Sequence, residues 1–459
     1  MTLYDVYGRE VDTGMLREEQ AAPTMTGVRN IYSVMHPAIG LTPERLTAIL
    51  QQAEFGDPYL SLELAEEVEE KDLHYLAVLG TRKNAVAQLD VVVRAASSSS
   101  EDQRAAAMVS EMLIDGPIQL DSVLFDVLDV LGKGFSATEI MWNTSGREWF
   151  PAQLKWRDPR WFAFDWISGE EILVRTLKGE IIPVESDAQT RLPTHFGGSG
   201  LYSSKSPGIG IQPMTAPLAP YKFVTHFAKA KAGLAIRGGL ARAAGWAYLF
   251  KNYVLKDWVT FTEVFGQPLR VGKYHPGASE QDKQALLTAV SRIGTDAAAI
   301  MPESMIIEFT EAHQNGSSEL YQNVCEYLDA QVSKAVLGQT LTTEMPRSGG
   351  SRAAAQVHEG VRRDILNADS KRLAATLARD LVRPIVELNM GPQVRYPKIE
   401  LALPDDSDAK VFAEIVAMLA DRGLRVGQKT ILDKLGIAEA GEGEAVLEAM
   451  GARESNGGI

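Results

Sequence analysis

The sequence predicts an α+β protein that is mostly helical, and two patterns carry this prediction. Apolar residues recur every three to four positions, with few helix breakers, in residues 41–88, 226–266 and 351–390, which is the spacing of amphipathic helices. Residues 135–184 instead hold short β-branched and aromatic segments separated by turns, as in a small antiparallel sheet. The 459 residues are 45% hydrophobic and 23% charged, which is typical of a folded protein of about two to four domains.

The N-terminal third is predicted to be an irregular arm followed by helices. Residues 1–40 contain scattered Pro and Gly, whereas Thr42 is a candidate N-cap for a helix that starts at Pro43. A further helical stretch covers 64–89, and we interpret its acidic run as a solvated face, because blocks of like charge usually face water. Residues 89–96 resemble a strand, and Ser100 or Asp102 would cap the next helix. The acidic run consists of Glu66, Glu67, Glu69, Glu70 and Asp72.

The middle of the chain is predicted to contain the sheet. Residues 120–134 form a helix that Gly132 and Gly134 would end, with a strand directly after it. The segment KWRDPRWFAFDW (155–166) mixes aromatic and basic residues, which suits single-stranded nucleic acid. The stronger interpretation is that Trp156, Trp161 and Phe164 fill a β core while the charged residues between them shape the turn around Pro159. Residues 187–220, rich in Gly, Ser and Pro, indicate a long loop.

The second half alternates helices with a compact insert. Residues 221–270 carry eight Lys and Arg against two acidic residues, within a helix whose Gly and Ala spacing suits close helix packing. A strand (267–274), a short helix (279–293) and one or two strands (297–311) follow as an α/β insert, and another helix covers 317–338. A loop with Pro, two Gly and two Ser precedes a long helix that is kinked or ended near Pro384. Residues 400–459 are acidic, with 12 Asp and Glu against 6 Lys and Arg.

Catalytic, metal and cofactor sites are not predicted. The single cysteine, Cys325, excludes an intramolecular disulfide and a Cys-based zinc site. The seven His residues form no metalloprotease pair, and the Gly-rich stretches at 198–206 and 208–210 lack the full pattern of a phosphate or dinucleotide loop. No run of about 18 apolar residues indicates a membrane span. The net charge of −14 argues against a surface that wraps DNA, though not against a protein that lets DNA pass.

Six segments in this order resemble the Mu-like family of tailed-phage portal proteins. They are GFSATEIMW (134–142), LKWRDPRWFAFD (154–165), the block 222–274, AVLGQTLTTE (335–344), GSRAAAQVHEGVRRDIL (350–366) and LGIAEAGEGEAVL (435–447). The resemblance covers residues 30–450 and rests on extended similarity, because none of the segments is a catalytic motif. It implies a non-enzymatic ring, usually of about twelve copies, that forms the DNA channel at one capsid vertex for packaging, head–tail joining and ejection.

The resemblance also implies a domain plan, that of the portal fold. Its parts are an N-terminal arm (1–40), a wing (41–225), a first stem helix (228–265), an α/β clip (267–313), a second stem helix (316–337), a tunnel loop (339–352), a long wing helix (351–390) and an acidic C-terminal wing and crown (391–459). The implied partners are double-stranded DNA, the terminase large subunit, a head-completion adaptor, and the major capsid and scaffold proteins, with no membrane. The implied location is the portal vertex of the virion, after assembly in the host cytoplasm.

Three groups of residues are candidate functional sites on this plan. In the tunnel loop, hydroxyl and arginine side chains would touch phosphates without reading sequence, and Gly349 and Gly350 supply backbone freedom. The basic residues of the stem are expected to pair with adjacent subunits or to face the outer stem surface. The groups are the DNA-channel loop (Thr342, Thr343, Arg347, Ser348, Gly349, Gly350, Ser351, Arg352), the clip contact for motor and adaptor (Arg270, Lys273, Tyr274, His275) and the basic stem face (Lys229, Lys231, Arg237, Arg242).

Alternatives stay open at this point. The loop could be a plain surface connection. The chain could be a head–tail adaptor or scaffold protein without a DNA channel, in which case a stable monomer is expected. It could also be a Mg²⁺-dependent DNA-processing enzyme, which would require a carboxylate cluster that nothing in the sequence singles out.

Overall fold

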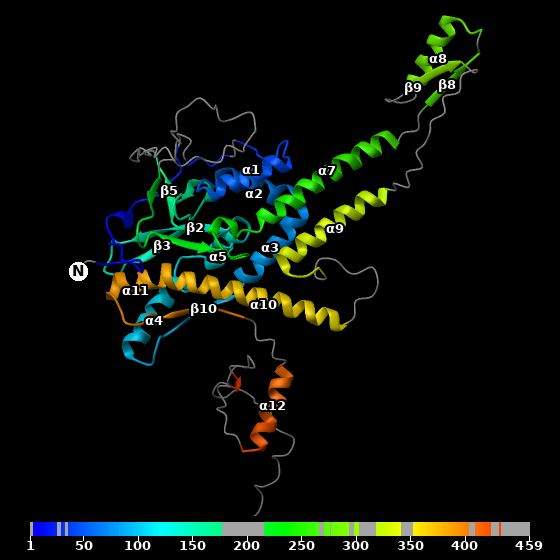
Figure 1. Ribbon diagram of the computed structural model, residues 1–459. Coiled ribbons are helices and arrows are strands. Elements are labelled where there is room, and N and C mark those ends of the chain that lie inside the picture. Colours follow the sequence, from blue (N-terminus) through cyan, green and yellow to red (C-terminus); the bar gives the residue numbers. More distant parts are fainter. Residues whose placement is uncertain are drawn as a thin grey trace, which may run out of the picture. The chain divides into compact units, whose positions relative to one another are not determined.

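A computed structural model describes the chain over most of its length (Figure 1). The described residues are 3–24, 29–32, 35–176, 215–265, 270–275, 277–292, 298–302, 318–340, 352–403, 409–423 and 431–432. The chain divides into two compact units, Met1–Ala402 and Leu403–Ile459. The second unit contains helix α12 (Ala409–Asp421), and all other labelled helices and strands belong to the first.

The first unit is mostly helical, as the sequence predicts. Short 3₁₀ turns occur at Met15–Arg17, Pro159–Trp161 and Ala235–Arg237, and a π turn covers Ala378–Val382. The helices are α1 (Pro43–Glu54), α2 (Tyr59–Lys71), α3 (Leu73–Ala87), α4 (Ser100–Leu113), α5 (Leu120–Val127), α6 (Val130–Lys133), α7 (Ala241–Phe265), α8 (Glu280–Arg292), α9 (Ser318–Leu337), α10 (Arg352–Leu377) and α11 (Arg383–Met390).

The strands form four small sheets. Two three-stranded antiparallel sheets have the orders β3-β2-β7 and β4-β5-β6, while β1 pairs antiparallel with β10 and β8 pairs parallel with β9. The predicted antiparallel region is thus confirmed, but it is completed by β6 and β7, which follow the undescribed residues 177–214. The strands are β1 (Asp90–Arg94), β2 (Phe135–Asn143), β3 (Phe150–Arg157), β4 (Phe162–Phe164), β5 (Ile172–Arg175), β6 (Thr215–Pro217), β7 (Phe223–Phe227), β8 (Arg270–Tyr274), β9 (Ala298–Pro302) and β10 (Lys398–Ala402).

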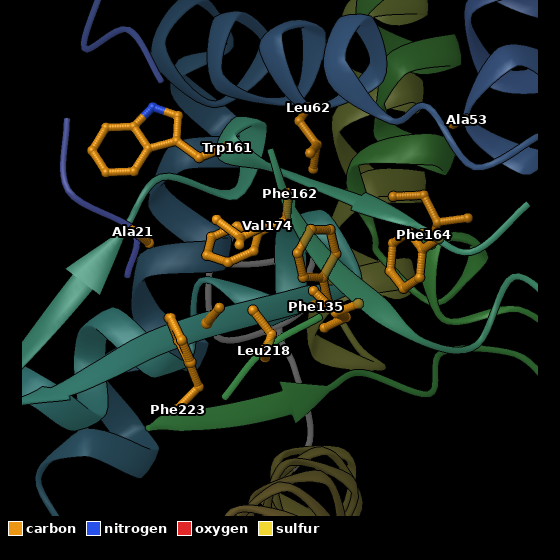
Figure 2. Packing of buried hydrophobic residues seen from close by; sticks show 13 residues of the cluster. Ala21, Ala53, Leu62, Phe135, Trp161, Phe162, Phe164, Val174, Leu218 and Phe223 are labelled. Atoms are coloured by element: carbon orange, nitrogen blue, oxygen red, sulfur yellow. The ribbon is translucent and has the colours of Figure 1, made fainter. Parts of the chain in front are cut away.

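A hydrophobic core lies between the two three-stranded sheets (Figure 2). The ring of Phe135 meets that of Phe164 edge-on, with centroids 5.0 Å apart and planes at 80°, a favoured aromatic geometry. Trp161 is buried, and its indole N–H donates to the carbonyl of Asn30 at 2.7 Å. The predicted core role of Trp161 and Phe164 is therefore confirmed. That of Trp156 is wrong, because this side chain is 39% exposed.

Several helix ends follow from local sequence. The hydroxyl of Thr42 accepts a hydrogen bond from the N–H of Arg45, so the predicted N-cap of α1 is confirmed. The cap of α4 is Ser99 rather than Ser100 or Asp102, because the Ser99 hydroxyl accepts from the N–H of Asp102. Gly134 ends α6 in the left-handed region at φ 94°, which favours glycine, and β2 begins at the next residue.

The acidic run of α2 is not a solvated face, and this prediction was wrong. Of its five carboxylates, Glu70 is exposed, whereas Glu67 and Asp72 are each 4% exposed. Glu66 pairs with Lys133, and Glu69 pairs with Lys83 at 2.7 Å. These lysines come from other helices and are themselves buried with Asp129. Burial alone would raise the pKa of Asp129, but the charges of Lys133 and Lys83 hold it below its ordinary value.

The helix predicted from residue 226 begins only at Ala241. Residues 223–227 are strand β7, and residues 228–240 are irregular apart from one 3₁₀ turn. A Cβ on Gly239 would lie 2.4 Å from the carbonyl oxygen of Gly132, and a Cβ on Gly238 would lie 2.2 Å from that of Ala228. The two glycines therefore serve a backbone-to-backbone approach, not the helix packing that their spacing indicated.

The long C-terminal helix continues through Pro384. Proline cannot donate a helical hydrogen bond, and its ring presses on the carbonyl four residues earlier. The π turn Ala378–Val382 ends two residues before Pro384. In this turn the helical hydrogen bonds span five residues instead of four, which widens the helix just before the proline. The helical path from α10 through α11 is thus unbroken.

The N-terminal arm is held on sheet β3-β2-β7 by buried polar contacts. The carboxylate of Glu139, fully buried on β2, accepts from the N–H groups of Gln20 and Ala21 and from the guanidinium of Arg157. The ammonium of Lys222 donates to the carbonyl of Leu16 at 2.9 Å. The arm is irregular, as predicted, yet its residues 16–21 are bound to the body.

Candidate functional site

The candidate site is the pair of helices α7 and α9, which we call the helix pair, together with the βαβ unit between them in sequence. The two helices pack side by side (Figure 1). Trp258, near the end of α7, stacks on Tyr321, near the start of α9, with planes 9° apart. Lys251, nearer the start of α7, pairs with Asp329, nearer the end of α9. These two contacts make the helix pair antiparallel, so α7 leaves the body and α9 returns to it.

Lys251 fixes the helix pair to the body. Its ammonium lies 2.5 Å from Oδ1 of Asp329 on α9 and 3.1 Å from Oδ1 of Asp72. Asp72 is also the N-cap of α3, accepting from the N–H groups of His74 and Tyr75. Burial would lower the pKa of Lys251, but the two carboxylates raise it above its ordinary value. Three helices are therefore joined at one charged group.

A second joint connects the end of α9 to α10 through α3. Both a terminal nitrogen and Nε of Arg82 donate to the carboxylate of Asp369 on α10, at 3.1 and 2.7 Å, and its other terminal nitrogen donates to the carbonyl of Val336 at 2.7 Å. Gly338, at φ 71°, packs against α10 so closely that a Cβ would lie 2.8 Å from Val361. The joint therefore ties the end of α9, which precedes residues 341–351, to the middle and later turns of α10.

A third joint attaches β7 to the π turn. The N–H of Thr225 donates to Oδ2 of Asp380 at 2.9 Å, and its carbonyl accepts from the guanidinium of Arg379 at 2.7 Å. Residues 222, 226 and 228 of this segment pair toward β2, so Thr225 presents its backbone to the other edge. Two adjacent side chains thus take the place of a neighbouring strand. Nothing in the local sequence of either segment indicated this contact.

The predicted clip residues lie on strand β8 and directly after it. β8, α8 and β9 form a βαβ unit with parallel strands. Arg270 begins β8, and Lys273 and Tyr274 end it. The ammonium of Lys283 on α8 lies over the ring of Tyr274, 5.3 Å from the ring centroid. His275 follows the strand, and its Nδ1 accepts from the N–H of Gly277. Lys273 and His275 are exposed.

The predicted basic stem residues lie mostly outside helix α7. Lys229 and Lys231 are exposed in the irregular segment before α7, and Arg237 belongs to a 3₁₀ turn. Arg242 is the one residue of the group that lies on α7. It pairs with Glu54 of the same chain at 2.6 Å, and Arg237 approaches the same carboxylate at 3.4 Å. These two arginines are thus neutralised within one subunit.

The predicted tunnel loop lies almost entirely outside the described residues. Thr342, Thr343, Arg347, Ser348, Gly349, Gly350 and Ser351 belong to the undescribed range 341–351, whereas Arg352 is the first residue of α10. Within the part of the chain that the structure describes, no group of three or more His, Cys, Asp or Glu side chains could hold a metal ion. No helix among the described residues is long and apolar enough to cross a membrane.

Comparisons with known proteins identify the family of the chain. Residues 62–437 match the sequence profile of the family described as "Portal protein of Mu bacteriophage". The chain is 37% identical over 418 residues to "Mu-like prophage FluMu protein gp29" of Haemophilus influenzae, covering 90% of this chain and 74% of that one. It is 32% identical over 426 residues to the "Portal protein" of Escherichia phage Mu, covering 92% and 76%. A chain from "Neck of empty GTA particle computed with C6 symmetry" aligns at 11% identity and TM-score 0.47, covering 89% and 100%.

The profile match over most of the chain and the similarity to the phage Mu protein define the class: this is a portal protein, which is a structural component of a phage-type virion. The chain belongs to the Mu portal protein family.

Proposed function

We propose that about twelve copies of this chain form a ring around a DNA channel at the capsid vertex. The helix pair would be the stem, and the βαβ unit would be the clip. The observation that carries the proposal is the helix pair itself. Its contact to the body joins Lys251 to the buried carboxylate of Asp72, yet large apolar side chains on both helices face outward.

These outward side chains need a partner. Val259 is 57%, Leu320 58% and Tyr327 62% exposed. Phe250 and Leu255 of α7 are also exposed. A neighbouring copy that packs its own helix pair alongside would cover them, and a head-to-tail contact of this kind closes into a ring. The aromatic contacts of Tyr321 with α7 hold the two helices of one subunit together for that docking.

The electrostatics suit passage of DNA rather than tight binding. Each phosphate that a protein neutralises adds salt-dependent affinity, and a chain of net charge −14 limits that affinity. Arg237, Arg242 and Lys251 are engaged by carboxylates of their own chain, so they would add little to it. The hydroxyls and arginines of residues 342–352 would supply weak contacts to phosphates near the channel axis.

The remaining assignments follow the same plan. Lys273, Tyr274 and His275 at the end of β8 would contact the terminase large subunit during packaging and the head-completion adaptor afterwards. The major capsid and scaffold proteins would surround the ring, which would assemble in the host cytoplasm. Support for these partners comes from family membership and from the exposure of Lys273 and His275.

The test is to purify the full chain, measure its mass by native mass spectrometry and image it by negative stain. A closed ring with a central hole supports the proposal. The decisive variant is Val259→Glu with Leu320→Glu, which places charges on the outer faces and should abolish the ring while leaving circular dichroism unchanged. A chain that stays monomeric alone and also when coexpressed with its capsid and scaffold proteins contradicts the proposal. Nuclease activity of a compact monomer with Mg²⁺ would favour the enzyme alternative.

A further inference from the structure

A groove of about 830 Å³ runs between helix α10 with its π turn and strand β10. We call it the β10 groove. Its helical wall combines the small side chains of Ala374, Ala375 and Ala378 with longer basic side chains, and its opposite wall is the strand. None of the three predicted site groups lies in it, and the helix pair does not line it.

The β10 groove follows the edge of the strand. It is lined by the four consecutive residues 398–401. Successive side chains of a strand point to opposite faces, so a cavity on one face would touch every second residue. The partner strand β1 contributes no lining residue, although all five residues of β10 pair with it. The groove therefore lies along the edge of β10 that faces away from β1.

This edge has unused hydrogen-bonding groups. Within the described residues, the backbone of 398–402 makes hydrogen bonds with β1 alone. An edge strand with free N–H and C=O groups is a template for another extended segment, and proteins use such edges to bind peptides by strand addition. Five residues span about 17 Å, and the alanines opposite leave room for a backbone to approach.

The charges of the groove define its occupant. Three charged residues of the groove already form ion pairs: Arg379 with Asp380, Arg383 with Glu387, and Glu400 with Arg94. Lys371 and Lys398 are exposed, and neither forms an ion pair with any described residue. The groove thus offers an apolar floor, an open strand edge and two uncompensated positive charges. An extended segment that carries Asp or Glu complements all three.

We propose that the β10 groove takes an extended acidic segment of a second copy of this chain, which adds as a third strand to the β1–β10 sheet. A second copy fits the charge, because Asp and Glu outnumber Lys and Arg by 60 to 46. The proposal rests on the proposed ring, and adds a contact between copies that is separate from the helix pair. Because donor segment and acceptor groove are different surfaces, the contact is of the head-to-tail kind that closes rings.

Two variants test the groove. Ala375→Trp fills it with bulk, and Lys371→Glu with Lys398→Glu reverses its charge. The matched controls are Ala107→Trp, at an exposed alanine of α4, and Arg104→Glu with Arg147→Glu, at two exposed arginines outside the groove. Each control introduces the same residue, and the same change of charge, as its test variant. Circular dichroism and thermal unfolding of the two groove variants and the two controls establish that all four proteins fold. If Ala375→Trp disturbs α10, the double variant Lys371→Glu with Lys398→Glu still tests the groove.

The readouts are the concentration of half-assembly, from light scattering on a dilution series, and amide hydrogen exchange of residues 396–402. Both groove variants should raise the half-assembly concentration by about tenfold or more, which corresponds to about 1.4 kcal/mol per contact, while the controls match wild type. In wild type, exchange at 396–402 should slow on assembly. Rings that form normally in both groove variants, with unchanged exchange, would overturn the groove contact and leave the ring intact. A wild-type chain that never assembles would overturn the ring and this occupant together.

Discussion

The ammonium of Lys251 on α7 lies 2.5 Å from Oδ1 of Asp329 on α9, and the same ammonium reaches Asp72 at the start of α3. One side chain therefore holds the helix pair closed and also fastens it to the body. If Lys251 were neutral, both carboxylates would lose their charged partner. The loss would be costly for Asp72, because this carboxylate is almost fully buried.

Lys251→Met should lower the free energy of unfolding by about 2 kcal/mol, because hydrogen bonds to charged groups are lost and the buried carboxylate of Asp72 stays behind. The methionine preserves most of the side-chain volume. Urea denaturation measures the change. Lys256→Met, at an exposed position five residues along the same helix, is the control and should change stability by less than about 0.5 kcal/mol. Equal effects of the two substitutions would show that Lys251 is not a joint.

Gly239→Ala should destabilise the protein severely. The new Cβ would lie 2.4 Å from the carbonyl oxygen of Gly132 and 2.6 Å from the nitrogen of Gly134, and backbone atoms cannot rotate away as a side chain can. The matched control is Gly245→Ala on α7, whose Cβ would meet nothing nearer than a Leu46 methyl at 3.8 Å. That substitution should stabilise by about 0.5–1 kcal/mol, because glycine is a poor helix former. Thermal unfolding measures both variants. The melting temperature should fall for Gly239→Ala and rise for Gly245→Ala, and changes of the same sign would contradict the prediction.

Glu139→Gln should release the N-terminal arm. The buried carboxylate of Glu139 accepts from Gln20, Ala21 and Arg157 together, whereas a neutral amide offers one acceptor oxygen and no charge to the arginine. Limited trypsin digestion should cut at Arg17 at least about tenfold faster, since cleavage follows the population of the open form. Glu170→Gln, at an exposed carboxylate, should leave the digestion rate at that of wild type. An unchanged rate for Glu139→Gln would mean that the arm is held by its apolar contacts alone.

His226 should make the protein less stable in mild acid. Burial, with Arg379 and Arg372 nearby, lowers the pKa of His226 from 6.5 to about 4, so the native state keeps it neutral with its Nδ1 2.8 Å from the Thr376 hydroxyl. Because the unfolded chain takes up the proton first, this contribution is complete above pH 6.5 and is lost as the pH falls toward 4, to a total of about 3 kcal/mol.

The measurement is the free energy of unfolding of wild type and His226→Gln in urea at several pH values from 4 to 7.5. The difference between the two proteins should change with pH between 6.5 and 4 in the sense that wild type loses more. His275→Gln, at an exposed histidine, should leave the wild-type profile unchanged. Parallel profiles for wild type and His226→Gln would show that His226 titrates normally in the folded state.

Local features of the sequence were sufficient for most elements. Thr42 and Pro43 mark a helix start because a hydroxyl cap and a preset φ act within one turn, and the structure has both in place. Strand β1 and the alternation of helix, βαβ insert and helix also follow from periodicity. The family resemblance, carried by extended segments, is confirmed by the profile match over residues 62–437. The ends of elements were less certain, as the cap at Ser99 shows.

The acidic run shows where local interpretation fails. A block of carboxylates normally faces water because burying unpaired charge is costly. Here Lys83 and Lys133 arrive from α3 and α6 and neutralise it, and the sequence of α2 contains no sign of them. The interpretation of Gly238 and Gly239 as helix-packing residues is wrong for a similar reason. Small residues indicate that another part of the chain comes close, but the local sequence does not say which part. In the structure it is the backbone of Gly132 and Ala228.

Helix and strand preferences, caps and the family's segment order are encoded over a few to a few dozen neighbouring residues, so the chain alone specifies them. The joints of the molecule are pairs far apart in sequence: Thr225 with Asp380, Arg82 with Asp369, and Lys251 with Asp72. Each depends on distances that appear only after helices and sheets have packed. The same holds for the open edge of β10, since a strand is an edge strand only by virtue of which neighbour the folded chain places beside it.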